Sequence, residues 1–157
     1  MRTLIVLLFF LISNPGWANE IEDFLNSYAN SYTDYLNSGD SDYVAQVTDH
    51  FNKPLLQVPG KSNPFVAPDE AAVTRNFTAF MQRTREAGVR KIDWEQINYA
   101  QAGEKKAIVS NVARMLNSDG DVLRTSAAVY ALHRFDDGWK IIMISSLDTE
   151  DVITFKQ

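Results

Sequence analysis

The side chains in this sequence best suited to acid–base chemistry are two histidines, because an unperturbed imidazole titrates at about pH 6.5. They are His50 and His133, 83 positions apart and without any recognisable His/Glu spacing. We therefore expect no metal site and no cofactor. The absence of cysteine excludes disulfides and thiolate nucleophiles, and no serine-nucleophile motif or glycine-rich phosphate loop is present.

Each histidine also has a structural interpretation. By period-two counting, His133 shares one face of a strand with Thr125 and Val129. If that face lines a cavity, His133 lies near the cavity's rim; otherwise it is a partly buried strand histidine bonded to a neighbour. His50 follows a short predicted helix, where a cation interacts favourably with the helix dipole.

Three predicted helices occupy the first half of the chain. Apolar residues from Ile21 to Leu36 recur at helical spacing, and Gly39 supplies a stop. A second, shorter helix carries Tyr43, Val44 and Val47. A third helix begins near Pro68 and ends at Gly88, with Val73, Phe77, Phe80, Met81 and Thr84 on one face.

The second half reads as strands separated by turns. The candidates are 89–100, 105–116, 121–135 and 139–147, and a short strand at 55–58 lies earlier, between prolines. Asn117-Ser118-Asp119-Gly120 and Asp136-Asp137-Gly138 are strong turn signals. Consecutive strands with such short connections predict an antiparallel meander. With helices before it, this gives an α+β domain.

The first residues resemble a secretory signal peptide. Arg2 precedes an uninterrupted apolar run from Leu4 to Ile12, and Gly16-Trp17-Ala18 offers a small-residue cleavage site. We expect residues 1–18 to be a signal peptide cleaved near Ala18. Residues 19–157 would then form a single periplasmic or secreted domain. The net charge of −5, without basic clusters, argues against nucleic acid or, after cleavage, a membrane as partner.

The order of elements resembles the nuclear transport factor 2-like superfamily, which includes the SnoaL-like proteins and ketosteroid isomerase. Three stretches carry the likeness: the aromatic-rich helix end from Tyr32 to Asp40, the helix from Asp69 to Gly88, and the closing hairpin from Arg134 to Leu147. The resemblance implies a cone-shaped, cystatin-like fold with helices packed on a strongly curved antiparallel sheet around a cavity. It also implies a homodimer through the sheet's outer face.

Ketosteroid isomerase chemistry needs a carboxylate base and an oxyanion hole made by a tyrosine and a protonated aspartic acid. The resemblance puts Tyr32 at the tyrosine position. The base position falls near Gln57 or Val58, and the second donor falls near Ala131. Neither glutamine nor valine abstracts a proton, and alanine donates none. The favoured interpretation of Tyr32 is a core aromatic residue in a helix already rich in aromatic side chains.

We therefore predict an exported, non-catalytic SnoaL-like domain that binds a small apolar or amphipathic ligand in its cavity or serves in protein assembly. The residues expected to line the cavity are Tyr28, Tyr32, Phe77, Thr125, Val129 and His133. One alternative is an isomerase or dehydratase that uses Tyr32 and His133 as catalytic residues. Another is a periplasmic partner-binding or immunity protein. The enzyme requires both side chains to point into one enclosed pocket.

Overall fold

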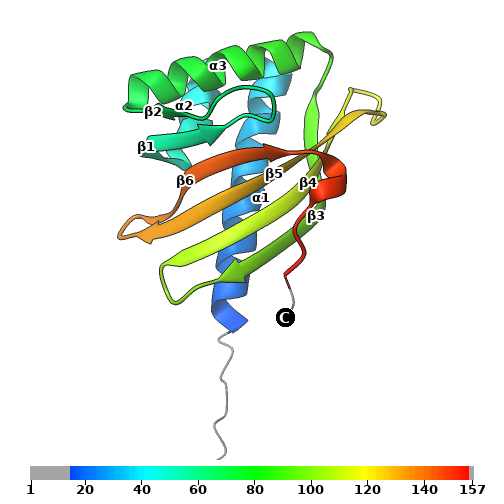
Figure 1. The fold of residues 1–157 in the computed structure, drawn as a ribbon. Helices are drawn as coiled ribbons and strands as arrows, with labels where there is room; N and C mark the ends of the chain where they lie inside the picture. The colour runs from blue at the N-terminus through cyan, green and yellow to red at the C-terminus, as the bar shows by residue number, and fades with distance from the viewer. Residues whose placement is uncertain (1–14, 156–157) are drawn as a thin grey trace, which may run out of the picture.

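A computed structural model describes residues 15–155 as three helices packed on a six-stranded sheet (Figure 1). In chain order the elements are α1 (Pro15–Ser38), α2 (Asp42–Asp49), β1 (Phe51–Val58), β2 (Phe65–Ala67), α3 (Glu70–Glu86), β3 (Lys91–Gln101), β4 (Lys106–Leu116), β5 (Val122–Phe135), β6 (Gly138–Leu147) and the 3₁₀ turn η1 (Thr149–Asp151). The predicted α+β cone fold is confirmed. Residues 1–14, which make up most of the predicted leader, lie outside the described residues.

The apolar face predicted for α1 is buried. Ile21, Leu25 and Leu36 are fully enclosed, and this face packs into the main hydrophobic core. The helix ends at Ser38, where Gly39 adopts a φ of +72° and donates its N–H to a carbonyl of the last turn. A Cβ at Gly39 would lie 2.9 Å from Cζ of Arg85, a side chain that crosses this helix end from α3. The positive φ therefore favours glycine here, whereas the contact with the end of the flexible Arg85 side chain could be relieved by a shift of that side chain.

α3 starts two residues later than Pro68, the predicted first residue. Asp69 is the N-cap, with an extended backbone, and its Oδ1 accepts the Ala72 N–H at 2.8 Å. Pro68 thus precedes the cap and cannot be part of the helix. Arg83 and Arg85 lie in the last turn, and Gly88 follows with a φ of +89°. Like the first helix, α3 turns its apolar face towards the sheet.

The sheet is mixed, with the strand order β2-β1-β6-β5-β4-β3. The four long strands form the predicted antiparallel meander, but β1 pairs with β6 in parallel, for example Leu56 with Met143. The prediction of a wholly antiparallel sheet is therefore wrong for the pairing of β1 with β6. Strands as distant in the chain as β1 and β6 have no tight turn to impose antiparallel pairing. β2, which the sequence did not predict, adds an edge strand to β1.

The orientation of β5 differs from the prediction, which had Val129 and His133 facing the cavity. Tyr130 and Leu132, at even-numbered positions, lie in the core beneath the helices, opposite Val109 and Ala107 of β4. The odd-numbered positions of the strand centre therefore point to the outer face. On that face the C-terminal segment contacts the sheet, where the Ile153 N–H donates to Ser110 Oγ at 3.0 Å. In Figure 1 α1 runs behind the sheet, and the C-terminal segment lies on the opposite side of the sheet.

No helix within residues 15–155 has both the length and the apolar character needed to cross a bilayer.

Candidate functional site

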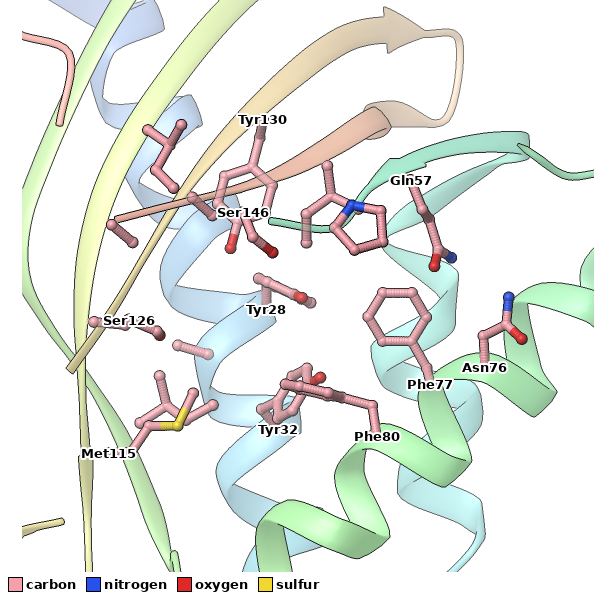
Figure 2. A pocket seen from close by; sticks show the side chains of 18 of the residues that line it. Tyr28, Tyr32, Gln57, Asn76, Phe77, Phe80, Met115, Ser126, Tyr130 and Ser146 are labelled. Carbon is pink, nitrogen blue, oxygen red and sulfur yellow. The ribbon is translucent and has the colours of Figure 1, made fainter. Parts of the chain in front are cut away.

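A cavity of about 650 Å³ lies between α1, α3 and the helix-facing side of the sheet (Figure 2). Its size falls in the range of about 300 to 1,000 Å³ that is typical of small-molecule sites. Most of its wall is aromatic and aliphatic. The aromatic lining residues are Tyr28, Tyr32, Phe65, Phe77, Phe80, Trp94 and Tyr130. These rings come from α1, α3 and three strands, so the tertiary fold assembles the cavity.

Two tyrosines of α1 form one wall of the cavity. Tyr28 and Tyr32 are four residues apart, so they project from the same helix face. Their rings meet edge to face at a centroid distance of 5.5 Å, and the Tyr130 ring lies 6.2 Å from that of Tyr28. Burial raises the pKa of Tyr28 and Tyr32 well above the usual value, and raises that of Tyr130 to about 12. All three phenols therefore stay protonated near neutral pH.

Two amide side chains face the cavity near β1. Gln57, on β1, and Asn76, on α3, both line it, and Figure 2 shows their amide groups on the same side of the cavity. The Gln57 Nε2 atom is buried and, within residues 15–155, has no hydrogen-bond partner. A buried donor left without an acceptor costs free energy. A ligand acceptor bound at this point would relieve that cost.

The charged residues of the lining are all arginines. Arg75 and Arg83 come from α3, and Arg124 comes from β5. Within the described part of the chain, the lining contains no aspartate, glutamate, histidine or lysine. Among the described residues, none of these three arginines lies within ion-pair distance of a carboxylate. Among the described residues, the cavity wall thus combines apolar surface, neutral donors and cations, and it includes no carboxylate or imidazole that could serve as a general base.

Four of the six residues predicted to line the cavity do so: Tyr28, Tyr32, Phe77 and Thr125. Whether they bind a ligand stays a prediction. Val129 and His133 are not among the lining residues, because the central part of β5 turns its odd-numbered side chains outward. The His133 ring packs against Phe135 at 4.7 Å, and in the ladder His133 lies between Lys106 and Lys140. The structure therefore does not bring Tyr32 and His133 into one pocket.

The positions compared with ketosteroid isomerase divide in the same way. Tyr32 and Gln57 both lie in the cavity, whereas Ala131 belongs to the outward-facing set of β5. The inward neighbour at that point is Tyr130, which keeps its proton. Within residues 15–155, neither a carboxylate base nor a carboxylic acid donor is found in the lining.

A second hollow, of about 400 Å³, surrounds His50. The His50 Nδ1 lies 2.9 Å from the Gln46 carbonyl oxygen, which can only accept, and Nε2 lies 3.2 Å from Ser27 Oγ. Burial lowers the pKa of His50 below its usual value. The ring therefore caps α2 as a neutral donor and not as the cation that the sequence suggested.

Sequence reasoning named Gln57 only as a position that lacks the isomerase base, and it missed Asn76 and the three arginines as cavity residues. Polar and charged side chains in a helix or strand are ordinarily assigned to the solvent-facing side. Neither the residue type nor the spacing of these arginines indicates a cavity, and their place in its wall becomes visible once the fold is known. A cluster of three or more metal-ligating side chains is not found among the described residues.

Comparison with known proteins places the chain in a family. Residues 19–149 match the family model described as NTF2-like protein (DUF6841), so the chain belongs to this NTF2-like family. No curated protein matches it.

Solved structures share the fold at low sequence identity. An NTF2-like protein with a cystatin-like fold from Novosphingobium aromaticivorans is 12% identical and superposes with a TM-score of 0.64 over 85% of this chain and 82% of that one. A protein from the same organism, provisionally assigned as an aromatic ring hydroxylase, is 14% identical. It superposes with a TM-score of 0.57 over 86% of this chain and 90% of that one. A provisionally assigned dehydratase of the NTF2-like family from Streptomyces avermitilis is 13% identical. It superposes with a TM-score of 0.59 over 84% of this chain and 95% of that one. Identities this low establish the fold alone.

Proposed function

We propose that this protein is an exported NTF2-like domain that binds a small amphipathic molecule in its cavity without transforming it. The observation that carries the proposal is the composition of the cavity wall, in which the described residues supply aromatic rings, phenols, amides and arginines but no carboxylate or imidazole. Apolar walls with a few convergent polar groups are the usual form of a ligand site. Such a wall supplies binding energy and orientation.

Proton transfer is the step that the cavity supports least. A general base must hold a suitable pKa and lie within hydrogen-bond reach of the proton it removes. The phenols that line the cavity have raised pKa values, and an amide such as that of Gln57 is not basic. Arginine stays protonated. The dehydratase and hydroxylase assignments of similar folds therefore do not transfer on the strength of these residues.

Export is part of the proposal and has two supports. The leader-like residues precede the predicted cleavage near Ala18, and the match to the family model begins at residue 19. Cleavage there would remove the first residues of α1 and leave its buried positions from Ile21 onward. N-terminal sequencing of protein recovered from a periplasmic or culture fraction should give Asn19, and an intact Met1 would contradict export by this route.

Ligand binding can be tested on the mature protein with a panel of neutral aromatics, steroids and fatty alcohols. We expect at least one class to raise the melting temperature, because a ligand that binds only the native state stabilises it. Ser126→Phe should abolish the shift by filling the cavity. Ser62→Phe adds the same ring on an exposed loop and should leave the shift unchanged.

The fate of the bound molecule separates binding from catalysis. After prolonged incubation at a protein concentration above the Kd, chromatography should recover the ligand unchanged. Conversion of a panel member that Ser126→Phe prevents would establish an enzyme and contradict the non-catalytic proposal. Failure of every class to bind would leave protein assembly, the other predicted use of this scaffold, as the better hypothesis.

A further inference from the structure

Among the described residues, arginine–carboxylate pairs occur elsewhere in this protein but not in the cavity wall. Arg114 pairs with Asp93 on the outer face, and Arg134 pairs with Glu20 at 3.2 Å. Arg75, Arg83 and Arg124 line the cavity without a carboxylate partner in the part of the chain that the structure describes. The protein as a whole carries a charge of −5. Three cations in the wall of one cavity, with no carboxylate among its described lining residues, favour an anion there.

Two of these arginines flank the same end of the cavity. The Arg124 Nε lies 2.8 Å from the Met115 sulfur, and the positive charge of Arg124 influences the pKa of Tyr32. The Tyr32 ring in turn packs edge to face on Phe80, at 6.2 Å, one helical turn before Arg83. Figure 2 shows Tyr32, Phe80 and Met115 together at this end. Arg83 from α3 and Arg124 from β5 therefore approach this end from two different elements.

Neutral donors occupy the other end of the cavity. Gln57, with its unpartnered Nε2, and Asn76 lie near β1, away from the Tyr32 end (Figure 2). Between the two ends the wall is formed largely by Tyr28, Phe77 and Tyr130. The wall therefore has Arg83 and Arg124 at one end, an aromatic middle, and at the other end the two amides together with Arg75, which precedes Asn76 in α3. This order of groups fits an elongated molecule with one anionic and one hydrogen-bond-accepting terminus.

We infer that the ligand of this cavity is an aromatic carboxylate whose anionic group binds Arg83 and Arg124. The inference rests on the proposed ligand-binding function and specifies its chemical class. Guanidinium groups match carboxylates in geometry and form charge-assisted hydrogen bonds. Aromatic rings of the wall offer stacked and edge-to-face contacts to a planar ring system. The Gln57 amide donates to an acceptor at the far end of the ligand.

The test compares two probes of nearly identical shape, 2-naphthoate and the neutral 2-naphthamide, by isothermal titration calorimetry at neutral pH. We expect wild-type protein to bind the carboxylate at least about tenfold more tightly than the amide. The double variant Arg83→Gln/Arg124→Gln should lose this preference while it keeps its affinity for the amide. Lys61→Gln removes an exposed cation outside the cavity and should keep the preference.

The outcomes separate this inference from the proposed function. Equal affinity for the two probes, or a preference that survives in the double variant, would overturn the carboxylate assignment and leave ligand binding intact. Binding of neither probe would also overturn it, and the neutral panel would then decide the proposed function. Each variant must have a far-ultraviolet circular dichroism spectrum and a melting temperature like those of the wild type. Misfolding then does not explain a loss of binding or of the preference for the carboxylate.

Discussion

The rings of Tyr28 and Tyr32 meet edge to face on the buried face of α1, with centroids 5.5 Å apart and ring planes at 86°. This pair serves both stability and the site, because the same rings face the hydrophobic core and the cavity. Tyr32 also contacts Phe80 of α3. One side chain thus connects the two helices that enclose the cavity.

Replacing Tyr32 tests this double role. Tyr32→Leu removes the aromatic contacts to both neighbours and should lower the free energy of unfolding by about 1 to 3 kcal/mol. Tyr32→Phe keeps the ring and should change it by less than about 1 kcal/mol. Urea denaturation of both variants measures the difference. If the two variants were equally destabilised, the hydroxyl and not the ring packing would be the important feature.

Gln57 should trade stability against binding. Its unpartnered Nε2 lowers the stability of the unliganded protein, so Gln57→Leu should leave stability unchanged or raise it by about 1 kcal/mol. The same change should weaken binding of any ligand that accepts a hydrogen bond from the amide. Denaturation and calorimetry on one preparation measure both effects.

Gln101 provides the matched control. Its Nε2 is likewise buried without a partner among the described residues, but the residue does not line the cavity. Gln101→Leu should affect stability as Gln57→Leu does and leave ligand affinity unchanged. A loss of affinity in both variants would show that the effect does not arise from the cavity.

His50 should make the protein less stable in mild acid. Because burial lowers its pKa in the folded state below the usual 6.5, the unfolded chain binds a proton more readily than the native one. Its contribution is complete above about pH 6.5 and is lost as the pH falls below that value through the folded pKa. The free energy of unfolding should fall between about pH 7 and about pH 5 in the wild type, and fall less in His50→Gln. If the free energy of unfolding fell as steeply with pH in His50→Gln as in the wild type, this assignment would be wrong. It would also be wrong if the fall disappeared only in His133→Gln.

The homodimer through the outer face of the sheet stays a prediction with a specific test. Ile108, on β4, is 38% exposed on that face. Ile108→Lys should convert a dimer to a monomer in light scattering after size exclusion, because a buried unpaired charge is costly at an interface. Val122→Lys, at the exposed strand end, should not. A monomeric wild type would contradict the prediction directly.

Local signals in the sequence were enough for most elements. The turns at Asn117–Gly120 and Asp136–Gly138 delimit β5, and Asn117 Oδ1 accepts the N–H groups of Asp119 and Asp121 at 2.9 and 2.8 Å. Helical spacing of apolar residues identified α1 and α3. The parallel pairing of β1 with β6 left no such signal, since it depends on the path of the chain between them.

The orientation of β5 could not be derived because both of its faces are apolar. Tyr130 lies in the core, but Val129 on the opposite face is only 8% exposed. A strand covered on both sides lacks the polar alternation that marks a solvent face. This double covering is why His133 was expected in the cavity. Arg124 was missed as a cavity residue for the opposite reason, because a polar side chain rarely indicates a ligand cavity.

The most direct test of ligand binding in the cavity is a nuclear magnetic resonance titration that follows the side-chain amide groups of ¹⁵N-labelled protein with 2-naphthoate or a hit from the neutral panel. Gln57 and Asn76 line the cavity, whereas Asn98 and Gln101 lie elsewhere on the sheet. We expect the side-chain signals of Gln57 and Asn76 to shift in a saturable manner while those of Asn98 and Gln101 stay in place. Saturable shifts confined to Asn98 and Gln101, or to the residues around His50, would contradict binding in this cavity.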